Sequence, residues 1–326
     1  MKVLVTGGAG YIGSVLTRQL LDKGYKVRVL DLLMFGGEPL LDLFNNPSFE
    51  FVKGDVRDEK AVRKALDGID AVAHLAAIVG DPACAKDPEL TNDINLNGSK
   101  LLYNIANELG VKRFIFASTC SNYGKMKDPE AFVDETSELS PVSLYAQTKV
   151  EIELFLLGQP KTNTCKPTCL RFSTVYGLSL RPRFDLTVNE FTKELALGRE
   201  LVVFGEQFWR PYCHVVDLAR SVGIVIEAEE DKVAFEVFNV GDTTENYQKQ
   251  MIVAEVLKQI PGAKVSYVKK NEDPRDYRVA FEKIKNQLGF EITINVPQGI
   301  AQTIQCVEDG FLSNPDDPKY KNVQPS

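Results

Sequence analysis

Short apolar runs alternate with amphipathic helical patterns through the first half of the chain, and this alternation restricts the possible folds more than any other feature. The runs are almost wholly apolar, which predicts strands buried on both faces of a sheet. Because each parallel pair of strands needs a crossover connection, this order favours a parallel sheet covered by helices on both faces. The predicted strands are 2–7, 26–33, 49–55, 70–77 and 112–118, and the predicted helices between and after them are 11–24, 59–68 and 92–109.

The regular alternation ends near residue 175. We expect an α/β fold: a Rossmann-type doubly wound parallel sheet with a smaller mixed α/β C-terminal lobe. The first expected domain is 1–175, together with later strands from roughly 211–241. The second expected domain is 176–312, and a loose polar tail follows over 313–326. The elements predicted beyond residue 175 are helices at 189–198 and 246–260, an extended piece running into a helix at 211–228, and strands at 200–205 and 235–241.

The composition argues against some classes of protein. A net charge of −7 over 326 residues disfavours a general nucleic-acid-binding surface. No apolar run is long enough to cross a bilayer, and glycine follows the first apolar stretch at once, which favours a strand over a secretory leader. The six cysteines are scattered, which favours reduced thiols in a cytoplasmic protein. Cys165 and Cys169 have the spacing of a metal-binding pair, but no second pair lies nearby, so we interpret them as buried strand residues and expect no metal.

The stretch TGGAGYIG lies between the first predicted strand and the first predicted helix. This pattern is typical of dinucleotide-binding loops: Gly7 allows the tight turn, Gly10 lets the backbone approach a pyrophosphate, and Gly13 lets the helix pack close to the sheet. The pyrophosphate then lies at the helix N-terminus, beside Tyr11 and Ile12, where backbone N–H groups favour negative charge.

Asp31 follows the second predicted strand and selects the cofactor. A carboxylate there can accept hydrogen bonds from both ribose hydroxyls of NAD and repels the 2′-phosphate of NADP. No arginine follows it directly, so the sequence predicts NAD. Further candidate cofactor-binding residues follow the third and fourth strands: Asp55, Val56, Leu75, Ala76 and Ala77.

Tyr145 and Lys149 lie four residues apart at the start of a predicted helix, and therefore on one face. A phenol with an ordinary pKa of about 10 is a weak base at neutral pH. A nearby ammonium, aided by a positively charged nicotinamide ring, stabilises the phenolate and lowers that pKa. Behind a dinucleotide-binding loop, the pair indicates proton abstraction from a sugar hydroxyl while hydride leaves the same carbon for NAD.

Seven segments of the chain occur in the order found in one enzyme family: TGGAGYIG, HLAA, INLNGSKLL, STCSNYG, YAQTK, LRFSTVYG and WRPYCHVVDLA. Over nearly its whole length the chain resembles the NAD-dependent nucleotide-sugar epimerases and dehydratases, which are extended short-chain dehydrogenases/reductases. The resemblance implies that Thr119 hydrogen-bonds the reacting sugar oxygen, that Tyr145 is the base, and that Lys149 binds the nicotinamide ribose. It also adds candidate cofactor contacts: Asn95, Ser173 and Val175.

Cys120 and Ser121 stand where sugar 4,6-dehydratases of this family carry Asp and Glu, the acid and base that expel water. A thiol and a hydroxyl cannot easily replace that pair, so we expect oxidation and reduction at a carbinol rather than dehydration. We interpret both residues as part of the substrate-binding wall. An acid/base role of the Cys120 thiol in epimerisation is the alternative, but no second proton-transfer partner is evident.

Arginines gather in the loops of the less regular half, where a guanidinium can bind a diphosphate in bidentate fashion. By resemblance, Arg210 and Arg275 match positions that hold the nucleotide diphosphate. Arg181, Arg183 and Asn189 lie where the substrate loops of the family usually fall. For each arginine alone, a surface salt bridge is the alternative interpretation.

The segments TVYGLSLRPRFDLTVNEFT and DPRDYR resemble those of GDP-heptose 4-dehydrogenases, which leave a 4-keto sugar. This subgroup implies a nucleotide-diphosphate sugar as the substrate and a place in polysaccharide biosynthesis. The alternatives are a UDP-hexose 4-epimerase, which returns the hydride to the opposite face, and a non-catalytic NAD-binding sensor. The family also implies a homodimer formed through the helices 92–109 and 143–158.

Overall fold

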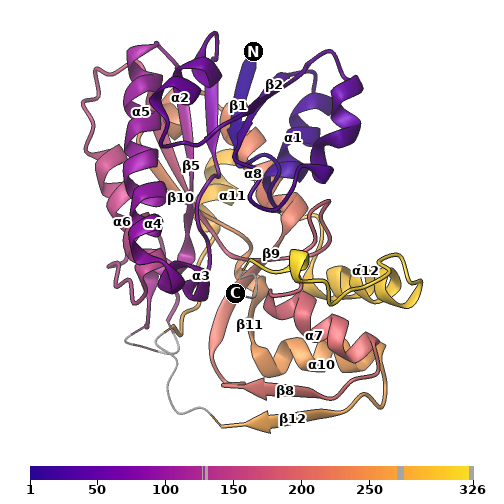
Figure 1. Cartoon of the computed structure of the whole chain (residues 1–326). Coiled ribbons are helices and arrows are strands. Elements are labelled where there is room, and N and C mark those ends of the chain that lie inside the picture. The colour runs from indigo at the N-terminus through magenta and orange to yellow at the C-terminus, as the bar shows by residue number, and fades with distance from the viewer. Residues whose placement is uncertain (127, 129–130, 270–274, 323–326) are drawn as a thin grey trace.

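The computed structural model describes residues 1–126, 128, 131–269 and 275–322, and it contains one large parallel sheet above a smaller lobe (Figure 1). The strand order of the large sheet is β10-β6-β5-β4-β1-β2-β3, and every neighbouring pair is parallel. The predicted doubly wound α/β fold is therefore confirmed. The seven strands are β1 (Lys2–Thr6), β2 (Lys26–Asp31), β3 (Phe49–Lys53), β4 (Ala71–His74), β5 (Arg113–Thr119), β6 (Lys166–Phe172) and β10 (Glu236–Val240).

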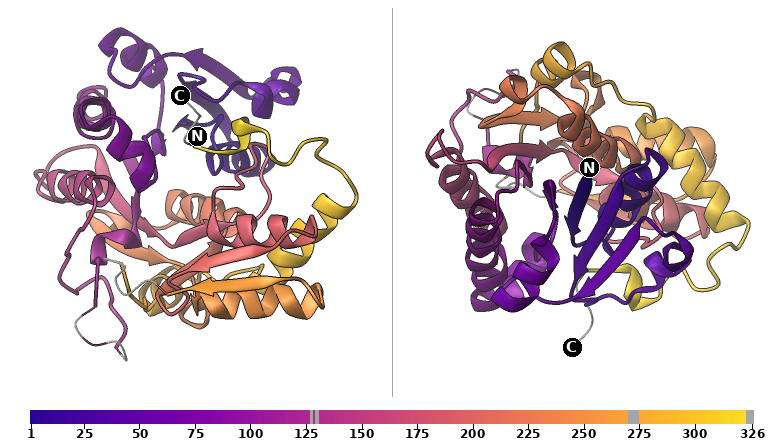
Figure 2. Two further views of the ribbon diagram at one scale, coloured as in Figure 1. Left: turned by 60° about the horizontal axis from the view of Figure 1, so that its bottom comes forward. Right: turned by 90° about the horizontal axis from the view of Figure 1, so that it is seen from above.

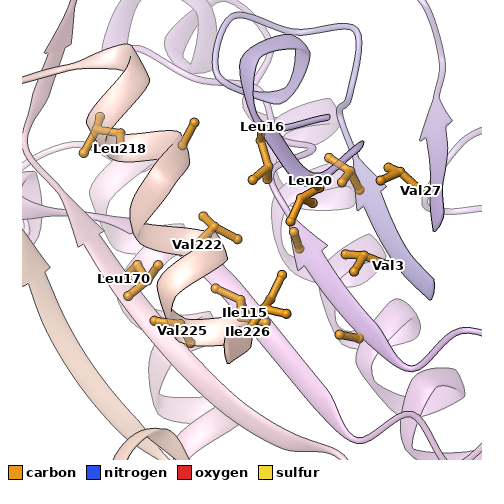
Figure 3. Close-up of a cluster of buried hydrophobic side chains, with 14 of the residues drawn as sticks. Val3, Leu16, Leu20, Val27, Ile115, Leu170, Leu218, Val222, Val225 and Ile226 are labelled. Carbon is orange, nitrogen blue, oxygen red and sulfur yellow. The ribbon is translucent and has the colours of Figure 1, made fainter. Parts of the chain in front are cut away.

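Helices cover both faces of this sheet (Figure 2). On one face, α1 (Gly13–Asp22) and α8 (Val215–Glu227) pack side by side, and their apolar residues meet those of the strands (Figure 3). Leu16 and Leu20, one helical turn apart on α1, are fully buried there. The opposite face carries α2 (Glu59–Leu66), α5 (Ser99–Glu108) and α6 (Leu144–Leu157).

The long helix predicted at 92–109 is divided in the structure. It consists of α4 (Pro88–Asn92), the π-helical turn η2 (Asp93–Gly98) and α5. Inside the wide turn, Asn95 bonds both backbone groups of Ile78: its Nδ2 donates to the carbonyl oxygen over 3.0 Å, and its Oδ1 accepts from the N–H over 2.8 Å. Residue periodicity could not reveal this division, because the partner of Asn95 lies in the loop after β4.

In its described residues, the lobe is built from two small sheets and three longer helices, whose apolar residues form a core of their own. The strand order β11-β9-β7 makes one sheet, and β8 pairs with β12 in the other. The strands are β7 (Thr174–Tyr176), β8 (Leu201–Phe204), β9 (Trp209–His214), β11 (Asn246–Gln248) and β12 (Val265–Val268); the helices are α7 (Thr187–Ala196), α10 (Lys249–Gln259) and α12 (Val296–Glu308). Shorter elements are α3 (Asp81–Lys86), α9 (Glu230–Val233), α11 (Glu282–Leu288), η1 (Glu38–Asn45), η3 (Cys120–Tyr123), η4 (Thr243–Glu245) and η5 (Pro318–Tyr320).

The C-terminal segment corrects one expectation from composition. Of the tail predicted to be loose, residues 313–322 pack against the lobe; residues 323–326 lie outside the described part of the chain. The Tyr320 carbonyl oxygen accepts a hydrogen bond from Phe184 N over 2.9 Å, and Asn322 N donates to Asp185 over 3.0 Å. Specific partners of this kind are invisible in a polar composition.

Two other expectations concern cysteines and membranes. Cys165 and Cys169 are buried, and no cluster of potential metal ligands occurs among the residues that the structure describes. Within the same residues, none of the helices combines the length and the apolar character that a membrane span requires.

Candidate active site

The predicted site residues follow the carboxyl ends of neighbouring strands in the large sheet. The strands β5, β4, β1 and β2 lie next to one another in that order and end at Thr119, His74, Thr6 and Asp31. Ligands of doubly wound sheets bind outside this edge, where the strand order reverses; here that point lies between β1 and β4. The fold thus brings the glycine loop, Asp31 and Thr119 to one edge.

The glycine loop has the shape that a dinucleotide pyrophosphate needs. Gly7 has a φ of +73°, and a Cβ built on Gly13 would lie 2.1 Å from the Gly7 oxygen, so neither position accommodates a side chain. On Gly10, a Cβ would meet only the Gly7 oxygen within 4 Å, at 3.1 Å, so space is open beside its backbone in the described part of the molecule. The N-terminus of α1 has neither a side-chain cap nor an acidic residue in its first turn among the described residues. An open backbone at such a helix end fits NAD.

Asp31 binds the glycine loop directly. Its Oδ2 accepts from Ala9 N over 2.9 Å, and its Oδ1 accepts from Leu33 N over 2.7 Å. Burial raises the pKa of the Asp31 carboxyl, and these two hydrogen bonds oppose that shift. The carboxylate thus links the end of β2 to the loop after β1, at the place where the ribose hydroxyls of NAD are expected.

The other candidate cofactor residues surround this edge in different ways. Asp55, after β3, pairs with Arg57 over 2.7 Å, and Val56 is buried in the core beneath it. Leu75, Ala76 and Ala77 follow β4, and Ala76 N lies 2.9 Å from the position of a Cβ on Gly7.

Asn95, Ser173 and Val175 have partners within the protein. The Asn95 side chain is committed to the Ile78 backbone described above. The Ser173 hydroxyl donates to the Val240 carbonyl over 2.7 Å, and Val175 lies in β7, which pairs with β9. These residues therefore connect the loops and strands at the edge of the site.

The three predicted catalytic residues come together at the end of β5. Ser143 caps α6 by accepting a hydrogen bond from Ala146 N over 3.3 Å, which fixes the helix that carries Tyr145 and Lys149. The Thr119 side chain lies close enough to the Tyr145 phenol to lower its pKa, and Lys149 Nζ lies 5.9 Å from the centre of the Tyr145 ring.

The pKa shifts of Tyr145 and Lys149 differ from the expectation that the ammonium of Lys149 lowers the pKa of the Tyr145 phenol. Burial raises the pKa of the Tyr145 phenol, although the Thr119 side chain opposes the shift. Burial also lowers the pKa of Lys149 to about 8, and its ammonium donates to the Ala117 carbonyl over 2.7 Å. Lys149 therefore does not by itself lower the phenol pKa in the protein, and a further positive charge beside the phenol is needed to favour the phenolate.

The side chains of Cys120 and Ser121 contact residues other than the catalytic pair. Cys120 is only 1% exposed; its thiol donates to the Arg171 carbonyl over 3.2 Å, and burial raises its pKa. The Ser121 hydroxyl lies 3.3 Å from the Tyr277 hydroxyl. A buried thiol with a raised pKa is a weak acid/base, which agrees with the interpretation that Cys120 does not replace a catalytic carboxylate.

A buried ion pair behind the catalytic residues was missed from the sequence. Glu153 and Arg171 are almost fully buried, and the guanidinium donates to the carboxylate over 2.7, 3.1 and 3.1 Å. Glu153 also accepts from Ser118, directly before Thr119, and from Asn122. The spacing could have revealed Glu153, because it follows Lys149 by one more helical turn on α6.

Asp81 is a second residue that the sequence analysis missed. It lies at the start of α3 and forms an ion pair of 2.8 Å with Arg275. Arg275 is the first residue after the undescribed residues 270–274. Its charge contributes to raising the pKa of the Tyr145 phenol. A carboxylate near the catalytic tyrosine could not be recognised from sequence, because no motif marks it. The DPRDYR segment itself is described only from Arg275 onward.

The predicted arginines fall into two groups. The Arg210 guanidinium lies 5.2 Å from the ring centre of Tyr277, two residues from Arg275, so these two can approach one ligand. Arg183 instead pairs with Asp185 over 2.8 Å and lies 6.0 Å from the Tyr11 ring.

Arg181 and Asn189 belong with Arg183 rather than with Arg210. Asn189 Oδ1 accepts from Gly177 N over 2.8 Å, and its Nδ2 donates to the Tyr11 hydroxyl over 3.2 Å. Arg181 lies on the Phe35 ring, in the loop after β2. This second group, expected in the substrate loops, therefore lies against the dinucleotide-binding loop.

Comparisons with known proteins agree with this geometry. The profile of a family described as "NAD dependent epimerase/dehydratase family" matches residues 3–241. A UDP-glucose 4-epimerase of Lactobacillus helveticus is 30% identical over 89% of this chain and 92% of its own length. A dTDP-glucose 4,6-dehydratase of Streptomyces niveus is 30% identical over 95% of this chain and 93% of its own.

A solved structure shows the same architecture with ligands bound. The UDP-glucuronic acid 4-epimerase of Bacillus cereus, in complex with UDP-glucuronic acid and NAD, superposes with a TM-score of 0.84 at 26% identity, over 95% of this chain and 99% of that one. The prediction of NAD as the cofactor is confirmed by these comparisons. By their names, the three proteins act on UDP- or dTDP-sugars, and none of them is a GDP-heptose dehydrogenase.

Proposed function

The chain belongs to the NAD dependent epimerase/dehydratase family, and on that premise we propose that it is a 4-epimerase of a nucleotide-diphosphate hexose. The observation that carries the proposal is the meeting of Thr119, Tyr145 and Lys149 beside the glycine loop, with a buried thiol where the dehydratases of the family carry an acid. UDP-hexoses are the first substrates to test, because relatives of this chain are named as UDP-glucose and UDP-glucuronate 4-epimerases.

Each site residue has its own role in the reaction at C4 of the sugar. Tyr145 takes the proton of the C4 hydroxyl, and Thr119 holds the same oxygen by a hydrogen bond. Bound NAD supplies the acceptor for the hydride that leaves C4, which makes a 4-keto sugar. If the 4-keto sugar presents its opposite face, Tyr145 would return its proton to the C4 oxygen while reduced NAD, held beside these residues, would supply the hydride, which would give the epimer. Arg210 and Arg275 bind the diphosphate and let the sugar turn about it.

Dehydration is the less supported outcome for this chain. Expulsion of water from C5 and C6 requires a proton donor and a base beside the keto sugar. The thiol of Cys120 is bonded to a backbone carbonyl, and burial raises its pKa. The GDP-heptose 4-dehydrogenase assignment stays a prediction that the same experiment tests.

The experiment offers purified protein and NAD a panel of UDP-, dTDP-, GDP- and CDP-sugars, heptoses included, each deuterated at C4. A 4-epimerase gives a product that is inverted at C4 and keeps the deuterium, with no lasting rise in reduced nicotinamide absorbance. Accumulation of reduced nicotinamide with a 4-keto product indicates a dehydrogenase, and a 6-deoxy product indicates a dehydratase; either result contradicts the proposal.

A pair of variants tests the catalytic assignment. Tyr145→Phe should abolish turnover and still bind NAD. Tyr25→Phe is the matched control, because the Tyr25 hydroxyl contacts Glu227 far from the site and should be dispensable for activity. Absence of turnover in the unmodified protein, with NAD bound, would instead favour the non-catalytic sensor.

The homodimer, the cytoplasmic location and the place in polysaccharide biosynthesis stay predictions from the resemblance. Size-exclusion chromatography with light scattering tests the homodimer. A monomeric mass at micromolar concentration would contradict it.

A further inference from the structure

The C-terminal segment, residues 313–322, crosses the molecule between the large sheet and the lobe (Figure 1). On the lobe side it is anchored at several points. Besides the backbone contact to Phe184, the Tyr320 ring packs edge-on against the Phe184 ring at 5.9 Å, and Asp316 pairs with Lys193 over 2.7 Å.

The end of this segment also touches the sheet domain. Asn322 Nδ2 donates to the Val79 carbonyl over 3.4 Å, while Asn322 N donates to Asp185 in the lobe. Val79 lies two residues beyond Ala77, in the loop after β4 that borders the dinucleotide site. Residues 313–322 therefore form a strap, and Asn322 joins the loop after β4 to the lobe.

Beneath the strap lies Arg181, which is only 6% exposed. Its guanidinium donates to Asn322 Oδ1 over 2.6 Å and to the Lys321 carbonyl over 3.3 Å, and it packs 3.9 Å from the centre of the Phe35 ring. Its Nε has no hydrogen-bond partner within the described part of the chain. A buried guanidinium with an unused donor requires an acceptor, because an unpaired polar group is unfavourable away from water.

The surroundings of Arg181 identify the acceptor. Its loop lies on the dinucleotide-binding loop, because the Ser179 hydroxyl donates to the Tyr11 carbonyl over 2.7 Å. The charges of Arg181 and Asp31 also act on each other: Arg181 lowers the pKa of the Asp31 carboxyl, in part offsetting the effect of burial. Burial lowers the pKa of Arg181 to about 10, so the guanidinium is still positively charged at neutral pH. A cation that acts on Asp31, in a loop that lies on the glycine loop, is suited to the phosphate and ribose oxygens of the adenosine half of NAD.

We propose that Arg181 is a further NAD-binding residue and that the strap holds it in place, so that the strap must lift before the dinucleotide exchanges. This proposal differs from the expectation that places Arg181 in the substrate loops. An enzyme that returns its hydride gains from such a device, because the reduced cofactor must stay bound between the two half-reactions. The binding of the dinucleotide can be measured without any sugar, so this inference and the proposed epimerase activity can fail separately.

The test measures release of NADH from the full-length protein by stopped-flow fluorescence after mixing with excess NAD. Arg181→Met should increase the dissociation constant of NADH about tenfold, through loss of a charge-assisted hydrogen bond. Asn322→Ala should speed both binding and release, because it frees the end of the strap without removing the guanidinium. Lys321→Ala is the matched control, since only the backbone carbonyl of Lys321 contacts Arg181.

Each outcome decides one part of the inference. Release at the wild-type rate from both variants overturns it. Weaker binding by Arg181→Met with unchanged rates for Asn322→Ala supports Arg181 as a cofactor-binding residue and overturns the role of the strap. Because Asn322 lies near the C-terminus, its substitution keeps the test valid even if Arg181→Met fails to fold.

Discussion

Neutralising Glu153 should destabilise the protein strongly, because it leaves the guanidinium of Arg171 buried without a counter-charge. The two side chains are 1% and 5% exposed and lie 2.7 Å apart. Removing one partner of such a pair costs about 3–5 kcal/mol of unfolding free energy. Unfolding entropy is about 2.1 cal/mol/K per residue, so for a chain of 326 residues the Tm of Glu153→Gln should fall by about 4–7 °C.

Calorimetry and urea denaturation of Glu153→Gln measure this loss. The control is Glu151→Gln, two residues earlier on the exposed side of α6, where the carboxylate is 53% exposed and pairs with Lys100. That change should cost at most about 1 kcal/mol. The double variant Glu153→Gln/Arg171→Gln should cost about 1–3 kcal/mol less than the sum of the single changes. Equal losses for Glu153→Gln and Glu151→Gln, or strict additivity in the double variant, would refute the reasoning.

Three further predictions follow from the site. Gly13→Ala places a Cβ 2.1 Å from the Gly7 oxygen, so it should abolish NAD binding in equilibrium dialysis; retention of wild-type affinity would show that the loop can adjust. Asp31→Ser should weaken NAD binding and let NADP bind, because the 2′-phosphate no longer meets a carboxylate and Arg181 lies nearby. A titration with each dinucleotide measures both affinities, and undetectable NADP binding would contradict this prediction. The kcat/KM should rise with pH up to about pH 8, because burial raises the pKa of the Tyr145 phenol, so that the phenolate fraction still grows in this range, and the rise should stop as Lys149, with a pKa of about 8, loses its proton; a profile that is flat from about pH 6 to 8 would contradict both assignments.

Features set by local spacing could be predicted from the sequence. The glycine loop follows a strand and precedes a helix, and Tyr145 and Lys149 need only one helical turn to share a face. The alternation of strands and helices was sufficient to predict the parallel sheet, because the helices that connect its strands in the sequence also bury both of its faces.

Features that depend on packing between distant segments could not be predicted. The ion pair of Asp81 with Arg275 joins two loops that no periodicity relates. Arginine in a loop indicates an anion but not which one, so Arg181 was expected among the substrate loops, although its loop folds onto Tyr11. The C-terminal strap was missed for the same reason, since its hydrogen bonds involve backbone groups that composition does not describe.

The position of β10 in the large sheet has a consequence for biosynthesis. This strand is the only neighbour of β6 on one side of the described sheet, and it comes from residues 236–240, after β7, α7, β8 and β9 of the lobe. A nascent chain that has emerged only as far as β6 therefore exposes a strand edge and an apolar sheet face, which are sites of aggregation. The large sheet therefore cannot be completed before β7, α7, β8 and β9 of the lobe have been translated, and an exchange of lobes between relatives must carry this strand along.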